Sequence, residues 1–151
     1  GRLQKRGWVA GVGETAHHLT GLRRSWKQAS LCVRILKALG RDPALISWEE
    51  LDIIGALLEN IPPENLKLMS YKTIEPIIKS PNRESNQLIE TLIEFFNVGG
   101  DRYKVATNLG IHVNTVNYRL RKIEELTGLN LAKPADVTRL YISAVLYRVL
   151  G

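Results

Sequence analysis

Two amphipathic stretches separated by a glycine lie in residues 101–126, and this pattern constrains the chain more than any other. Apolar residues recur at helical spacing on both sides of the glycine: Val105, Ala106 and Leu109 before it, and Val116, Leu120 and Ile123 after it. Gly110 can adopt the left-handed conformation that ends a helix. The sequence therefore predicts two helices joined by a tight turn, the second over residues 113–126.

The residues around Gly110 have the spacing of a helix-turn-helix motif. Ala106, four residues before the glycine, allows two helices to cross closely, and Val116, six residues after it, faces back into the crossing. We expect Asp101 to cap the first helix and either His112 or Asn114 to cap the second. The start of the second helix would then be exposed to a partner.

Charge supports a nucleic-acid partner, because every charged residue from Arg102 to Lys122 is basic. Eleven side chains of this motif are predicted to contact duplex DNA: Arg102, Lys104, His112, Val113, Asn114, Thr115, Asn117, Tyr118, Arg119, Arg121 and Lys122. Arg121, Lys122 and Lys104 are expected to act through phosphates. Asn117 is the first choice as a base reader, because a carboxamide can pair bidentately with adenine.

Two other positions of the second helix have narrower expected roles. Val113 can offer a base only an apolar contact, for instance to a thymine methyl group. Thr115, close to the helix start, is expected to be a phosphate ligand or a local cap.

Residues 114–128, NTVNYRLRKIEELTG, closely resemble the C-terminal helix-turn-helix of the PucR/CdaR family of bacterial transcription regulators. The resemblance extends upstream over residues 88–100 and downstream into a closing helix over about 137–150. It implies sequence-specific binding of double-stranded DNA in the major groove. The chain departs from the family pattern at Val113 and Asn117, where a basic residue is usual, so the resemblance implies fewer phosphate contacts and leaves the base preference open.

The fold class expected is mainly α, with the helix-turn-helix domain preceded by a small α/β remnant and a helical linker. Residues 1–60 are expected to hold strands at 8–10 and 44–48, a turn at 11–13, and helices over about 20–39 and 49–58. They resemble the C-terminal part of a degenerate GGDEF-like domain. Residues 61–84 form the expected linker, with helices at 63–71 and 74–79 and a polar break at 80–85. Residues 85–151 form the DNA-binding domain, with a support helix over 87–98.

Apolar spacing predicts the buried faces of two further helices. In the first long helix the expected stripe comprises Leu22, Trp26, Ala29, Val33 and Leu36. Two segments are candidates for a dimer surface: the closing helix, with the apolar residues Leu140, Tyr141, Val145 and Leu146, and the α/β remnant over residues 1–60. A homodimer is expected, because paired helix-turn-helix units gain specificity from two half-sites.

Composition fits a soluble cytoplasmic protein: 44% of residues are hydrophobic, the net charge is +6, and the single cysteine, Cys32, excludes an internal disulfide. No apolar run reaches the roughly 20 residues of a membrane span. Any small-molecule effector is expected to be sensed by a part absent from this chain.

Signals for catalysis are weak, so no enzymatic activity, cofactor or metal is expected. Residues 11–16 match the dinucleotide fingerprint, but residues 17–21 delay the helix that this motif requires, and no acidic residue follows at the right distance. His17 and His18 are adjacent and point apart. The alternatives left open are a protein-interaction or dimerisation domain that binds no DNA and, more distantly, a nucleotide-binding or cyclase-like enzyme.

Overall fold

The computed structural model describes residues 7–41, 44–80 and 84–151. The first six residues of the expected 1–60 segment and the centre of the polar break, residues 81–83, lie outside these ranges. The chain is mainly helical, as predicted, and divides into two compact units, Gly1–Pro63 and Glu64–Gly151. Within the described residues, no helix is long and apolar enough to cross a membrane.

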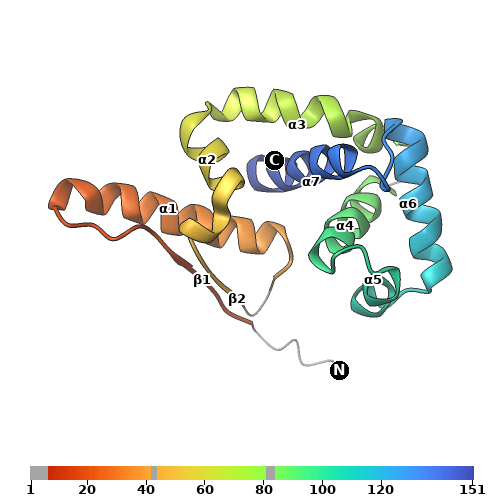
Figure 1. Cartoon of the computed structure of the whole chain (residues 1–151), viewed down its shortest axis with the longest axis horizontal. Helices are drawn as coiled ribbons and strands as arrows, with labels where there is room; N and C mark the ends of the chain where they lie inside the picture. Colours follow the sequence, from red (N-terminus) through yellow and green to blue (C-terminus); the bar gives the residue numbers. More distant parts are fainter. Residues whose placement is uncertain (1–6, 42–43, 81–83) are drawn as a thin grey trace. The chain divides into compact units, whose positions relative to one another are not determined.

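Unit 1 is built from two parallel strands joined by a long helix. β1 (Val9–Val12) pairs with β2 (Ala44–Ser47) so that Val9 lies opposite Ala44, and α1 (Leu19–Ala38) forms the crossover between them. A 3-10 turn, η1 (Glu49–Leu51), and α2 (Asp52–Asn60) follow β2 (Figure 1). Both predicted strands and both predicted helices are therefore confirmed.

The predicted turn at residues 11–13 is wrong in its position, because β1 continues through Gly11 and Val12. Gly11 lies directly against α1. A Cβ atom there would overlap the carbonyl oxygen of Ala29 and lie 2.7 Å from Cβ of Cys32. Glycine is needed at this position for close approach of strand and helix rather than for a turn.

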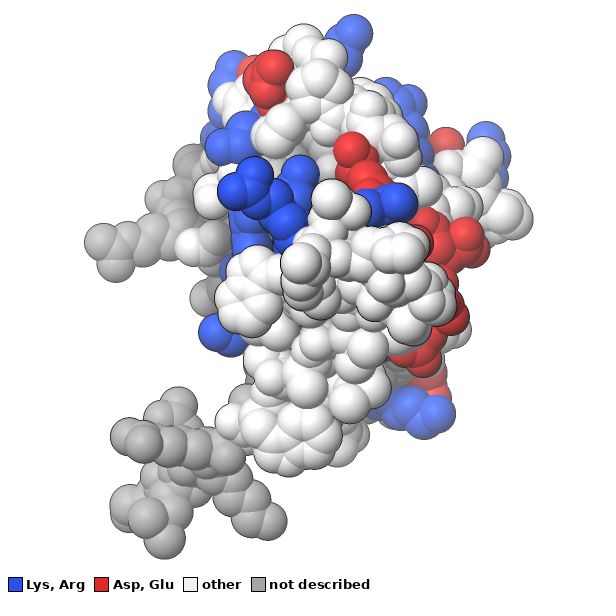
Figure 2. Space-filling model, turned by 90° about the vertical axis from the view of Figure 1, so that its left-hand side faces the viewer, with Lys and Arg blue, Asp and Glu red and all other residues white. Residues whose placement is uncertain are grey.

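The buried face of α1 also differs from the predicted stripe. Leu36 is buried as predicted, but Leu22 and Trp26 are 53% and 76% exposed, and the other buried residues are Gln28, Cys32 and Ile35. The helix backbone comes close to Gly11 at Ala29 and to Gly13 at Ser25, and the large apolar residues of its first turns face outward. Figure 2 views the side on which α1 begins, where much of the surface carries no charged groups. Burial raises the pKa of the Cys32 thiol, as suits an inert structural cysteine.

Unit 2 contains the remaining helices: α3 (Pro63–Ile78, beginning at the boundary), α4 (Glu84–Asn97), α5 (Arg102–Leu109), α6 (Val113–Thr127) and α7 (Pro134–Leu150). The prediction of two short helices in place of α3 is wrong. One continuous stripe of buried residues runs along it: Leu66, Ser70, Thr73, Ile74 and Ile77. Pro76 falls within the last turn of α3, so the missing backbone donor does not break the helix earlier.

α4 is the central helix of unit 2, since it contacts α5, α6 and α7. Figure 1 shows it (green) beside these three helices. The apolar residues of α7 are used inside the unit: Leu140, Val145 and Leu146 are fully buried, and the Tyr141 ring packs edge-on against Phe96 with centroids 5.1 Å apart. Leu140, Val145 and Leu146 are therefore not free to form the suggested dimer surface, and Tyr141 is half-buried.

Candidate nucleic-acid interface

The turn between α5 and α6 has the geometry that its glycine predicts. Gly110 adopts φ 65° and ψ 34°, and the backbone N–H of Ile111 donates to the carbonyl of Ala106 at 3.0 Å. Val116 is completely buried and Ala106 is 8% exposed. The close crossing of the two helices is confirmed, and it fixes how α6 projects from the unit.

Both helices are capped by side chains at their starts. Oδ1 of Asp101 accepts hydrogen bonds from the backbone N–H groups of Tyr103 and Lys104, at 3.0 and 3.1 Å. Nδ1 of His112 accepts from the backbone N–H of Asn114 at 3.2 Å. Of the two residues expected to cap α6, His112 is therefore the cap, while the side chain of Asn114 stays exposed on the first turn.

The two faces of α6 separate by burial. Val116, Leu120 and Ile123 are at most 1% exposed. The predicted contact residues on the rest of α6 are at least partly accessible: Asn114, Tyr118 and Arg121 are exposed, and Val113, Thr115, Asn117, Arg119 and Lys122 are half-buried. α6 therefore presents amides, a phenol and cations on the side away from the core.

The predicted residues of α5 lie next to this face. Nη1 of Arg102 donates to Oδ1 of Asn117 at 3.0 Å, so the start of α5 and the middle of α6 are joined by a polar contact. Lys104 is exposed, and its ammonium group lies 3.8 Å from the carboxylate of Asp101. Tyr103, between these two cations, is 75% exposed and was not among the predicted contact residues.

Arg119 has a different environment from the other cations of α6. Its guanidinium donates to Oγ1 of Thr91 at 3.1 Å and to Oε1 of Gln87 at 2.8 Å, both on α4. Arg119 was predicted to contact DNA because its partners on α4 lie far away in the sequence. The available signal was the pair Gln87 and Thr91, which share one face of α4 at a spacing of four residues.

α5 is tied to α4 as well. Nδ2 of Asn108 donates to Oε1 of Glu94 at 2.5 Å. Together with the bonds of Arg119, this contact makes α4 a common support for both helices of the motif. The support helix expected from the sequence is therefore present, and it holds α5 and α6 through polar bonds as well as through burial.

The competing sequence signals lie in unit 1, from the end of β1 to the start of α1. The helix that the dinucleotide fingerprint needs begins at Leu19, beyond the motif at residues 11–16. His17 and His18 are exposed, and the described residues hold no cluster of three or more metal-binding side chains.

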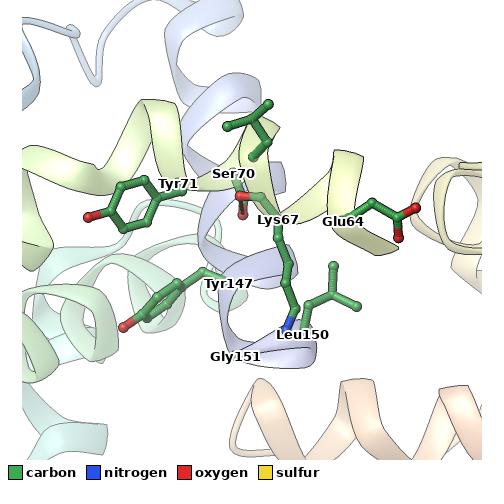
Figure 3. A pocket seen from close by; sticks show the side chains of 8 residues that line it. Glu64, Lys67, Ser70, Tyr71, Tyr147, Leu150 and Gly151 are labelled. Atoms are coloured by element: carbon green, nitrogen blue, oxygen red, sulfur yellow. Dashed lines mark hydrogen bonds between the residues drawn. The ribbon is translucent and has the colours of Figure 1, made fainter. Parts of the chain in front are cut away.

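A cavity of about 360 Å³ in unit 2 lies between α3 and the end of α7. Tyr71 and Tyr147 line one side of it, and Lys67 extends toward Leu150 (Figure 3). None of the predicted DNA-contacting residues lines this cavity.

Comparison with known proteins places the motif in a family. Residues 88–146 match the PucR C-terminal helix-turn-helix domain. The chain is 30% identical over 113 residues to the purine catabolism regulatory protein of Bacillus subtilis, covering 75% of this chain and 21% of that protein. It is 25% identical over 155 positions to the proline-responsive transcriptional activator PutR of the same organism, covering 91% of this chain and 34% of PutR.

The chain thus spans about a fifth to a third of the length of these curated relatives. The matched segment contains α5, the turn and α6, together with all eleven predicted contact residues and most of α4 and α7. Residues 88–146 are therefore similar to the C-terminal helix-turn-helix domain of PucR-type proteins, and the relatives reported by name are transcription regulators.

Proposed function

We propose that this chain binds double-stranded DNA sequence-specifically, with α6 in the major groove, as the DNA-binding part of a transcription regulator. One observation carries the proposal: α6 buries its apolar residues and leaves Asn114, Tyr118 and Arg121 accessible on the opposite side. An exposed helix with amides and cations on one face is suited to reading base edges while neutralising phosphates.

The proposed contact set keeps ten of the eleven residues predicted from the motif and gives Arg119 a supporting role. Lys104, Arg121 and Lys122 act through phosphates, and Arg102, Val113, Asn114, Asn117 and Tyr118 face the groove. His112 and Thr115 lie at the helix start, where backbone N–H groups favour a phosphate. Arg119 contributes by bracing α6 against α4.

Selection of bound fragments from a random duplex pool tests the proposal, followed by affinity measurements over a range of salt concentrations. We expect a defined site, with log K falling linearly as log salt rises. Asn117→Ala should lose discrimination at one base-pair position by about 1–3 kcal/mol while keeping nonspecific affinity. Folded protein that binds no duplex at low salt would contradict the proposal and favour a protein-interaction domain.

We also propose that the regulator acts as a homodimer on a pseudo-palindrome with half-sites ~34 Å apart. Because α7 uses its apolar residues within unit 2, the apolar side chains of α3 are better candidates for contact between subunits. Leu68 and Met69 are 69% and 51% exposed. Sedimentation of the free protein and footprinting of the complex test this. A monomer with a single asymmetric footprint would count against it.

The identity of the remaining segments is part of the same proposal. We assign residues 1–60 to the end of a GGDEF-like domain, residues 61–84 to a linker and residues 85–151 to the DNA-binding domain. The parallel β1–α1–β2 arrangement supports an α/β origin for the first segment. An effector would then be sensed by a part outside this chain.

A further inference from the structure

The carboxamide of Asn117 is held in one orientation by Arg102. Nη1 of Arg102, on the first residue of α5, donates to Oδ1 of Asn117 at 3.0 Å. A guanidinium offers donors and no acceptor, so the amide atom facing it must be the oxygen and not the NH2 group. The Nδ2 end of Asn117 is therefore directed away from Arg102.

We propose that Arg102 is a positioning residue for base recognition: by occupying the carboxamide oxygen, it makes Asn117 present hydrogen-bond donors to the base edge. This inference rests on the proposed function, since it requires α6 to lie in the major groove. An unconstrained asparagine pairs with adenine through both its oxygen and its NH2 group. The oxygen of Asn117 keeps a second lone pair, but because it is turned toward Arg102, the group that the side chain directs elsewhere is the NH2 donor, which reads acceptors.

In the major groove, this orientation of the Asn117 carboxamide would favour bases that present acceptors. Adenine and guanine offer N7, guanine also offers O6, and thymine offers O4, all of which accept hydrogen bonds. Cytosine offers the N4 amino group, which only donates. At the base facing Asn117, cytosine would meet the outward NH2 group donor to donor, and both groups would lose hydrogen bonds to water. Cytosine is therefore the base that this pair of residues excludes.

The hydrogen bond between Arg102 and Asn117 should affect base recognition more than it affects the stability of the fold. It is exposed in the free protein, where such a bond contributes little to the free energy of unfolding. Bound DNA would remove the competing water and strengthen the bond. Loss of Arg102 should therefore leave the fold intact and change the ranking of bases.

Lys104 provides a matched control. It has the same charge, lies on the same helix and is exposed, but its ammonium group pairs with Asp101. Lys104→Ala removes one cation near the interface without touching the carboxamide of Asn117. It should weaken binding to all sequences alike.

The experiment uses the site selected by the wild-type protein. Asn117→Ala first identifies the base pair whose discrimination depends on Asn117, and all four bases are then compared at that position. We expect the wild type to bind the cytosine variant roughly tenfold more weakly than the best site, the factor that corresponds to about 1.4 kcal/mol for one lost hydrogen bond. Arg102→Ala should reduce that difference to about twofold or less, because the freed amide can rotate to accept from cytosine.

Two further variants separate positioning from charge. Arg102→Lys keeps a donor and should retain most of the preference against cytosine. Asn117→Asp offers only acceptors and should invert the preference toward cytosine. Thermal unfolding of each variant confirms that the comparison is made on folded protein.

The results distinguish a failure of the positioning role of Arg102 from a failure of the proposed DNA-binding function. If the wild type ranks the four bases and folded Arg102→Ala ranks them in the same way, the positioning role is wrong while the proposed function stands. A wild type that prefers cytosine at this position also overturns the inference. If the wild type binds no duplex at low salt, the proposed function fails and the inference fails with it.

Discussion

At the scale of single residues, two arginines of α6 have the same charge but different surroundings. Arg121 is exposed, whereas the guanidinium of Arg119 is bonded to Thr91 and Gln87 of α4. We expect Arg121→Ala to weaken binding to all DNA sequences and to reduce the slope of log K against log salt by about one unit, because one phosphate contact is lost. Its melting temperature should stay unchanged.

Arg119→Ala is the matched comparison, two residues away. It should lower the free energy of unfolding by about 1–2 kcal/mol, since two hydrogen bonds to a charged donor disappear. The salt slope should change less than in Arg121→Ala. If Arg119→Ala and Arg121→Ala show the same salt slope and the same free energy of unfolding, Arg119 does not act as a brace between α6 and α4.

At the scale of elements, the start of α5 depends on one carboxylate. The Asp101 carboxylate accepts hydrogen bonds from the backbone N–H groups of Tyr103 and Lys104, which would otherwise lack partners at the helix start. Asp101→Ala should reduce stability by about 1 kcal/mol, whereas Asp101→Asn should retain most of it, because an amide oxygen can still accept these bonds. Chemical denaturation of the two variants measures the difference, and equal losses would mean that charge rather than capping stabilises α5.

The elements that could be predicted from sequence are those set by local chemistry. Asp101, His112 and Gly110 act on neighbouring residues of the backbone; Asp101 and Gly110 were predicted at their correct places, and His112 was one of two candidates for the cap of α6. The buried face of α1 was predicted only in part: Leu36 is buried as expected, but Leu22 and Trp26 are exposed, because the orientation of the helix depends on the approach of Ala29 to Gly11, far away in the sequence. Continuity of α3 was missed for a similar reason, since its buried stripe matters only once a core exists.

The candidate site shows the same division between local and distant determinants. Burial of Val116 and accessibility of Asn114 and Tyr118 follow from helical periodicity alone. The hydrogen bonds of Arg102 to Asn117 and of Arg119 to α4 join different helices. Their existence depends on how the helices pack, which the spacing of residues on one helix does not specify.

At the scale of the whole molecule, the division after Pro63 predicts two separable folding units. A fragment of residues 64–151 should fold alone and bind the selected DNA with the salt slope of the full chain. In the full chain, Gly11→Ala should destabilise unit 1, because its Cβ overlaps the backbone of α1, and should leave DNA binding unchanged.

Calorimetry and binding measurements on both proteins test this independence. Gly40→Ala is the control for Gly11→Ala, since open space surrounds a Cβ at that position and the cost is limited to backbone strain at φ 64°. A fragment that unfolds, or a Gly11→Ala protein that loses DNA binding in proportion to its stability, would show that the two units depend on each other.

The bonds that hold α6 to its neighbours also have a consequence for the thermodynamics of association. α6 is capped by His112, crossed closely by α5 and bonded to α4 through Arg119 before any DNA arrives. Little backbone entropy is then left to lose on complex formation, so encounter should be limited by diffusion and orientation rather than by refolding. The heat capacity change on binding should correspond to the contact surface alone, without the additional component that accompanies folding coupled to binding.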